Sequence, residues 1–163
     1  MATISKILEI DNCNKDLVLE VLYKPEFWEA ISPVDKMEAS FPAPNVLYTK
    51  IVDMIKVVNI AIEMEGELVL VDRGEEEGKG RLIEFNVRNN EDVKELEGNI
   101  RVKALSKTKS KIGVFIHHFH LSSNFLSMFG GASELILRTK IGGILRNIEK
   151  YCKTNDLKDF LSS

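Results

Sequence analysis

Apolar and polar residues alternate along the middle of the chain. The clearest stretch runs from Val58 to Val71, where nearly every second residue is apolar and many of the residues between them are polar. A period of two is typical of a β-strand with one buried and one solvated face. The same alternation recurs around Phe85 and Val102, and residues that favour turns separate these segments. We therefore expect antiparallel hairpins in this part of the chain.

The two ends of the chain carry helical patterns. After a short strand predicted at residues 3–10, residues 11–14 supply capping oxygens for a first short helix. Pro25 can start a second short helix, which must end before Pro33 because the residue preceding a proline avoids helical geometry. Residues 132–154 place their apolar side chains along one stripe, which predicts a long amphipathic helix.

This order of elements predicts an α+β fold. We expect an antiparallel β-sheet of about seven strands whose apolar face is covered by the long C-terminal helix, with two short helices after the first strand. No internal repeat or linker interrupts the pattern, so residues 1–163 are expected to form a single domain.

Composition narrows the range of functions. The chain has 22 Lys and Arg against 25 Asp and Glu, a net charge of −3, which argues against a nucleic-acid partner. Residues 1–10 contain Lys6 and Glu9 and fit neither a signal peptide nor a membrane span, so we expect a cytoplasmic protein without integral membrane association. Cys13 and Cys152 lie near opposite ends without zinc or redox spacing, and we expect reduced structural thiols.

The segment from Leu22 to Trp28, followed by Pro33 and Val34, stands where the predicted short helices meet the first hairpin. With these residues and this order of elements, essentially the whole chain resembles the START-like helix-grip superfamily, which includes pollen-allergen-type proteins, aromatase/cyclases and coenzyme-Q-binding proteins. Residues 64–90 and 111–131 are similar to a small group of archaeal members whose function is not established. The resemblance implies a curved antiparallel β-sheet wrapped around the long C-terminal helix, with a cavity for hydrophobic ligands between the sheet and that helix. It carries over no catalytic residue.

Two features of the sequence agree with such a cavity. Gly142 and Gly143 interrupt the long helix, where each costs about 0.5–1 kcal/mol relative to alanine. The pair fits close packing of the helix on the sheet, a cavity wall or a hinge. The apolar segment 125–129, followed by two glycines, fits either a gate over an entrance or a fixed plug that completes the core.

All three histidines lie in residues 117–120. On a regular strand, His118 and His120 point to one side and His117 to the other. We expect no metal site, because the sequence offers no further ligand at a useful spacing. Surface or interface histidines and a polar anchor inside the cavity remain open. The strand 111–121 is apolar on both sides, which fits an outer face buried in a homodimer or under a loop.

Three acidic residues, Glu63, Glu65 and Glu67, share the polar face of the long predicted strand. We interpret them as solvated carboxylates near Arg101 and Lys103 on a neighbouring strand, and not as acid–base catalysts.

The leading interpretation is a protein without catalytic activity that binds a hydrophobic small molecule, such as a fatty acid or an isoprenoid, and uses no cofactor. Its role would be that of a carrier, a store or a sensor. The expected ligand-binding residues are apolar positions of the strands and the long helix, Trp28 at one end, the 125–129 segment at the entrance and two histidines at a polar head. They are Trp28, Ile60, Ile62, Met64, Leu68, Ile83, Phe85, Val87, Ile100, Val102, His118, His120, Phe125, Met128, Phe129, Ile141 and Leu145.

Two other classes of function stay open. An enzyme of the cyclase or hydrolase type would need titratable groups such as Tyr48, Asp53, His118 or His120 to converge inside the cavity. A homodimeric interaction module would have a fully packed core. The phase of the strand in residues 45–57 is also open, because Leu47, Ile51 and Ile55 compete with Val46, Val52 and Met54 for the inner face.

Overall fold

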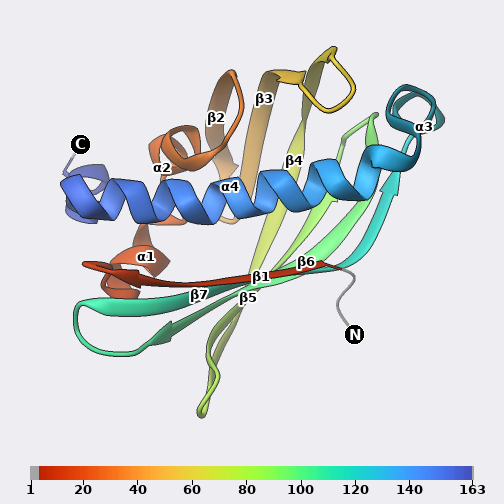
Figure 1. Ribbon diagram of the computed structural model, residues 1–163. Coiled ribbons are helices and arrows are strands. Elements are labelled where there is room, and N and C mark those ends of the chain that lie inside the picture. Colours follow the sequence, from red (N-terminus) through yellow and green to blue (C-terminus); the bar gives the residue numbers. More distant parts are fainter. Residues whose placement is uncertain (1–3, 163) are drawn as a thin grey trace.

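The computed structural model describes residues 4–162, in which a seven-stranded antiparallel sheet is crossed by one long helix (Figure 1). The strands are β1 (Ile4–Asp11), β2 (Lys36–Ala43), β3 (Val46–Ile55), β4 (Ile60–Glu76), β5 (Gly80–Arg88), β6 (Val93–Ala104) and β7 (Lys109–Leu121). The helices are α1 (Lys15–Val21), α2 (Pro25–Ile31), α3 (Ser123–Phe129) and α4 (Ser133–Thr154), with single 3-10 turns η1 (Gly130–Ala132) and η2 (Leu157–Phe160). The predicted fold class is confirmed. The predicted first strand began at Thr3, which lies outside the described residues.

The strands lie in the order β1-β7-β6-β5-β4-β3-β2, and every neighbouring pair is antiparallel. After β1 the chain crosses through α1 and α2 to the opposite edge of the sheet and returns by consecutive hairpins to β7. As a result, the last helix, α4, packs beside the first strand, β1. Figure 1 shows α4 crossing the sheet between β1 and the α2–β2 region.

Local sequence explains where the short helices begin. The side chain of Asn14 accepts a hydrogen bond from the N–H of Leu17 at 3.1 Å and caps α1. Pro25 occupies the first turn of α2, where its missing N–H costs no hydrogen bond. Ser122 caps α3 through the N–H of Phe125. The segment after β7, predicted as an apolar connection, is therefore a helix.

The glycine pair of α4 lets the helix approach the α2–β2 linker. A Cβ atom on Gly143 would lie 2.9 Å from Cβ of Pro33, closer than side chains pack. On either side of this contact, Lys140 Nζ donates to the carbonyl of Pro33 at 2.7 Å and Asn147 Nδ2 donates to the carbonyl of Ile31 at 2.9 Å. The predicted alternative of close packing placed the glycine pair on the sheet, whereas the structure places the α2–β2 linker against Gly143.

Buried apolar side chains form two clusters. The main cluster joins α1, α2, α4, β1 and the middle strands, and includes Ile10, Phe27, Ile83, Val102 and Leu145. The α3 cluster is smaller and consists of Ile55, Leu121, Phe125 and Phe129. Every helix within residues 4–162 is too short or too polar to cross a bilayer.

Pairing with β2 and β4 settles the phase of β3. Ile51 lies opposite Met37 and Met64, and Leu47 lies opposite Leu68. Leu47 and Ile55 are buried, whereas Val52 and Met54 are 40% and 39% exposed on the outer face. The inner face of β3 is therefore formed by Leu47, Ile51, Asp53 and Ile55.

Candidate functional site

The candidate site is the inner face of the sheet beneath α4. Of the predicted lining residues, seven belong to the main cluster and are buried: Trp28, Ile83, Phe85, Ile100, Val102, Ile141 and Leu145. Phe125 and Phe129 are buried in the α3 cluster, with Ile62, Met64 and Met128 packed against them. Phe125 and Phe129 thus complete a small core at the position where an entrance was expected. Ile60, opposite Ile55, is half-buried.

Between the two clusters runs a strip of apolar side chains that are only half-buried. This central strip consists of Ile51, Met64, Leu68 and Val87. The strand register places Ile51 opposite Met64, and Leu68 opposite Val87, so the four residues share the inner face. Met64 packs against the α3 cluster and Leu68 against the main cluster. The inner face is therefore packed at both ends and accessible in its middle.

The sheet forks beside this strip. The pairing of β4 with β5 begins only at Glu67, opposite Arg88, and the pairing of β5 with β6 ends at Asn86, opposite Glu97. The first parts of β4 and β6 consequently diverge, toward the end of the sheet where α3 lies (Figure 1). Gly66 permits the β5–β6 turn to enter the fork, because a Cβ at Gly66 would lie 2.7 Å from Cβ of Asn90.

A groove of about 570 Å³ lies at the fork. Its lining combines polar residues of the outer face with two residues of the fork itself: Tyr48, Lys50, Glu63, Met64, Glu65, Gly66, Glu67, Asn89, Glu91 and Asp92. The presence of Met64 in this lining shows that solvent reaches the central strip through the fork. The three glutamates pair with β3 and with Arg88 rather than with Arg101 and Lys103, because β5 separates β4 from β6.

The one buried charged side chain within residues 4–162 also lies on the inner face. Asp53, only 4% exposed, forms an ion pair with Lys140 of α4 and accepts the N–H of Asp35 at 3.2 Å. Since Lys140 also donates to Pro33, this pair joins β3, α4 and the α2–β2 linker at one edge of the inner space. In the sequence, Asp53 stands two residues after Ile51 and two before Ile55, and a period of two places all three side chains on one face of the strand.

The histidines lie on the outer face, so the predicted anchor role of His118 and His120 inside the cavity is wrong. β7 contains a bulge at His117: Ile116 pairs with Gly98, but His118 pairs with Glu97, the very next residue on β6. The extra residue reverses the alternation, and both His118 and His120 are exposed.

Each of two histidines has a polar partner on the outer face. His118 Nδ1 lies 3.8 Å from a carboxylate oxygen of Glu95, and His117 Nε2 lies 2.8 Å from Nδ2 of Asn99. Across residues 4–162, no group of three or more histidine, cysteine or acidic side chains could hold a metal ion.

The titratable residues that an enzyme would need do not lie together in the inner space. The hydroxyl of Tyr48 donates to Glu65 at 2.5 Å on the outer side of the sheet. That hydrogen bond raises the pKa of Tyr48 and so favours the protonated phenol. Of the four candidates Tyr48, Asp53, His118 and His120, only Asp53 faces the inner space.

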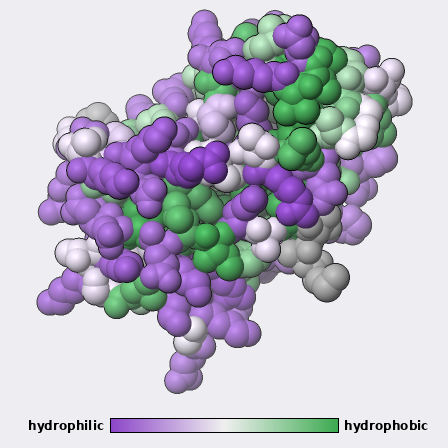
Figure 2. Space-filling model, viewed as in Figure 1, coloured by the Kyte–Doolittle hydropathy of each residue, from purple (hydrophilic) through white to green (hydrophobic). Residues whose placement is uncertain are grey.

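Figure 2 shows two apolar areas on the face that carries α4, one beside β1 and one where the first turns of α4 meet α3 and the β3–β4 turn. Each of these three elements carries one exposed apolar residue, and we call the three the α3 rim: Val57 of the β3–β4 turn, Leu126 of α3 and Leu135 of α4, at 55%, 43% and 54% exposure. The α3 rim borders the α3 cluster at one end of the inner space.

No family model and no curated protein matches the sequence. Solved structures do match. A START superfamily protein from Mycobacterium smegmatis superposes with a TM-score of 0.67 at 10% identity, over 92% of this chain and 96% of that one. The fold is the START helix-grip fold.

Two other START-fold structures are enzymes by name. The Zhui aromatase/cyclase from Streptomyces sp. R1128 has a TM-score of 0.60 at 11% identity, over 97% of this chain and 92% of that one. Norcoclaurine synthase from Thalictrum flavum, solved with dopamine and hydroxybenzaldehyde, has a TM-score of 0.57 at 18% identity, over 90% of this chain and 83% of that one. At these identities the likeness concerns the fold alone, and the narrower resemblance to archaeal members stays a prediction.

Proposed function

We propose that this START-fold protein binds a hydrophobic small molecule, such as a fatty acid or an isoprenoid, between the sheet and α4. The observation that carries the proposal is the central strip: four apolar side chains on the inner face, Ile51, Met64, Leu68 and Val87, are left half-buried between two packed clusters. Apolar surface that remains accessible inside a fold gains about 25 cal/mol per Å² when a ligand covers it. Ligand pockets characteristically pair such walls with a few polar groups.

The polar group of this site is the Asp53–Lys140 pair in place of the histidines. Lys140 is 29% exposed and already shares its ammonium between Asp53 and the carbonyl of Pro33. An ammonium has three N–H donors, and these two partners take two of them, so Lys140 can donate one more to an acceptor on the ligand, such as a carboxylate oxygen. Entry through the fork agrees with the position of Met64 in the lining of the groove there.

The proposal is tested by filling the central strip. In the Leu68→Trp variant, the larger side chain occupies the space at the middle of the inner face, and we expect the affinity for a fluorescent fatty acid to fall by about tenfold or more. The matched control is Val69→Trp, the next residue of β4, whose side chain points to the opposite face. Affinity equal in both variants, with both proteins folded by circular dichroism, would contradict the site.

A second arm of the same experiment examines the head group. The Lys140→Met variant should lose the preference for a fatty acid over the corresponding fatty alcohol, because the ammonium no longer pairs with the carboxylate. Lys150→Met, an exposed position later on α4, serves as the control. An unchanged preference in Lys140→Met would remove Lys140 from the site and leave the apolar part of the proposal standing.

The second candidate is an enzyme of the cyclase or hydrolase type in the same space. The observation that favours it is Asp53, a buried carboxylate on the inner face, next to the Lys140 ammonium. Turnover of a hydrophobic substrate that disappears in Asp53→Asn, while ligand affinity persists, would support catalysis.

A cytoplasmic location and a homodimer remain predictions. The outer face of β1 and β7 offers Ile7, which is 52% exposed, beside the half-buried Phe115. If sedimentation at high protein concentration showed only a monomer, the predicted homodimer would be wrong.

A further inference from the structure

The fold brings the two cysteines together although they lie at opposite ends of the sequence. Cys13 follows β1 in the turn to α1, and Cys152 lies in the last turns of α4. Both side chains are 0% exposed. Both side chains also belong to the main cluster of buried residues.

The backbone around each cysteine is held in place. Asn12 Nδ2 donates to the carbonyl of Cys152 at 2.6 Å, across 140 residues of sequence. The N–H of Cys13 donates to the carbonyl of Thr108 at 2.8 Å, and Ser110 Oγ donates to the carbonyl of Cys13 at 2.6 Å. Because these contacts fix the β1–α1 turn against the end of α4, the thiols meet in the folded chain.

The two thiols differ chemically. The hydrogen bond with Cys152, together with burial, raises the pKa of Cys13, whereas the same hydrogen bond lowers the pKa of Cys152. The Cys152 thiolate is therefore the form that the Cys13 S–H stabilises, and Cys152 is the better attacking group of the pair.

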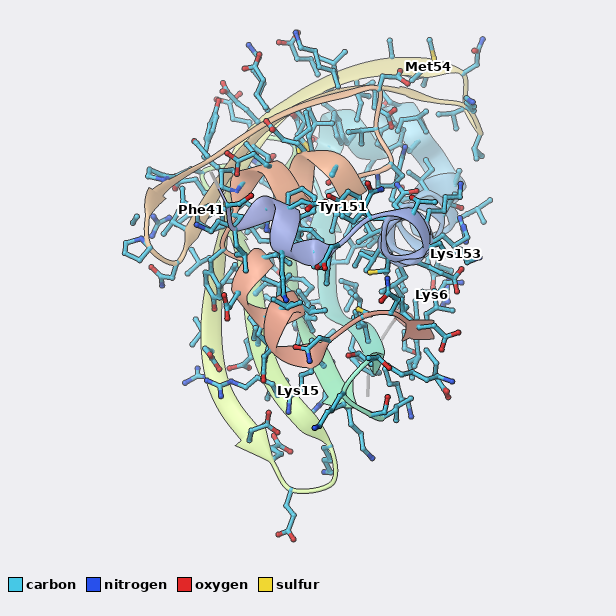
Figure 3. All side chains as sticks on the ribbon, turned by 90° about the vertical axis from the view of Figure 1, so that its left-hand side faces the viewer. Lys6, Lys15, Phe41, Met54, Tyr151 and Lys153 are labelled. Carbon is cyan, nitrogen blue, oxygen red and sulfur yellow. The ribbon has the colours of Figure 1, made fainter. Side chains whose placement is uncertain are left out.

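A surface cleft lies beside the pair, although neither cysteine lines it. A cleft of about 340 Å³ is lined by Asn12, Asn14 and Thr108 on one side and by residues 156–158 on the other, with Leu17 and Lys107 completing it. The cleft thus lies between the turn that holds Cys13 and the segment that follows Cys152. Figure 3 looks onto this end of the molecule, where the chain beyond Lys153 turns back past α1 and α2. Local opening of such a terminal segment exposes what it covers.

We propose that Cys13 and Cys152 are a site for a reversible disulfide, formed by exchange with a small-molecule disulfide such as oxidised glutathione. The Cys152 thiolate attacks one sulfur of the reagent, the reagent's S–S bond breaks, and one thiolate leaves and takes up a proton. Cys13 then loses its proton and attacks the Cys152 sulfur of the mixed disulfide, which releases the second thiol. Two protein thiols and one reagent disulfide become one protein disulfide and two reagent thiols. The crosslink requires no bound ligand.

The test compares two incubations of the full chain with a mixture of reduced and oxidised glutathione, one of the folded protein and one during refolding from urea. Intact mass and thiol titration in denaturant should show, in both, a monomer that has lost two hydrogen atoms and both free thiols without gaining glutathione. Refolded protein that keeps two thiols, or that carries glutathione instead of the crosslink, would overturn the proposal. If the crosslink formed only during refolding, the reagent would not reach the cysteines of the folded protein, and the proposed access through the cleft would be wrong.

Thermal unfolding supplies an independent readout. A bond between residues so distant in sequence restricts the unfolded chain, and we expect the crosslinked protein to melt about 5–15 °C above the same sample after reduction. The control is Cys13→Ala, in which Cys152 forms at most a mixed disulfide and the reductant leaves the melting temperature unchanged. Should Cys13→Ala not fold, the comparison of oxidised and reduced wild-type protein still decides, and equal melting temperatures would contradict the crosslink.

Discussion

Asp53 is the residue at which the chain departs from its own hydrophobic pattern. It occupies an inner position of β3 between Ile51 and Ile55, where an apolar side chain would be expected, and Lys140 from α4 neutralises it. The sequence shows the carboxylate, but its partner lies on another element, and only the packing of α4 brings them together. A buried ion pair adds little net stability compared with packed apolar side chains, because both charges lose their hydration. In the proposed function, this pair contacts the head of the ligand.

At the same scale, the hairpin of β4 and β5 carries a pH-dependent ion pair. Arg81 donates to both carboxylate oxygens of Asp72, at 2.8 and 2.7 Å, and these hydrogen bonds lower the pKa of Asp72 below its ordinary 3.8. A depressed pKa stabilises the fold above the unfolded value, and this contribution is lost as the pH falls through the folded pKa. Arg81→Met should therefore be less stable than wild type at neutral pH, and the difference should shrink as the pH falls below 3.8 and through the lowered pKa of Asp72.

Urea unfolding at a series of pH values measures this difference. Lys107→Met, an exposed position in the β6–β7 turn, is the control and should show no such convergence. A gap between Arg81→Met and wild type that stayed constant down to the acid limit would show that Arg81 stabilises the hairpin by packing alone.

At the scale of elements, alternation predicted the strands well where they are regular. Val102 stands between Arg101 and Lys103 and is fully buried, as a period of two requires. The prediction failed at His118 and His120, because one extra residue at His117 reverses the faces and no local signal in the sequence announces a bulge. The close approach of Gly143 to Pro33 was equally hidden, since it depends on a linker far away in the sequence.

The two glycines of α4 provide a matched test of that approach. An added Cβ at Gly142 would meet only the end of the flexible Arg146 side chain, at 3.2 Å, so Gly142→Ala should stabilise the protein by up to about 1 kcal/mol through helix propensity. At Gly143 the added Cβ meets the rigid Pro33 ring, and Gly143→Ala should destabilise the protein by about 1–3 kcal/mol. Equal free energies of unfolding for the two variants would mean that α4 does not rest on the linker.

For the whole molecule, the order of elements predicted an α+β fold with a long helix on an antiparallel sheet, because each segment has a clear period and the turns between them are short. The START fold itself was predicted from the family resemblance. The site was predicted only in part. The lining residues Leu68 and Val87 lie on the inner face as expected, but whether a face is packed or accessible depends on how α4 and α3 sit above it. The fork of the sheet and the half-buried central strip are properties of this tertiary arrangement, and no pattern along the chain encodes them.

We propose above that the inner face of this protein holds a hydrophobic ligand. The most direct test is native mass spectrometry of gently purified protein, followed by organic extraction and identification of any bound molecule. We expect one hydrophobic small molecule with an anionic head to be bound per protein chain. Extraction should remove this molecule, and the emptied protein should bind it again. Protein that arrives empty and also takes up no fluorescent fatty acid would contradict the account and would favour a packed core that serves as an interaction module.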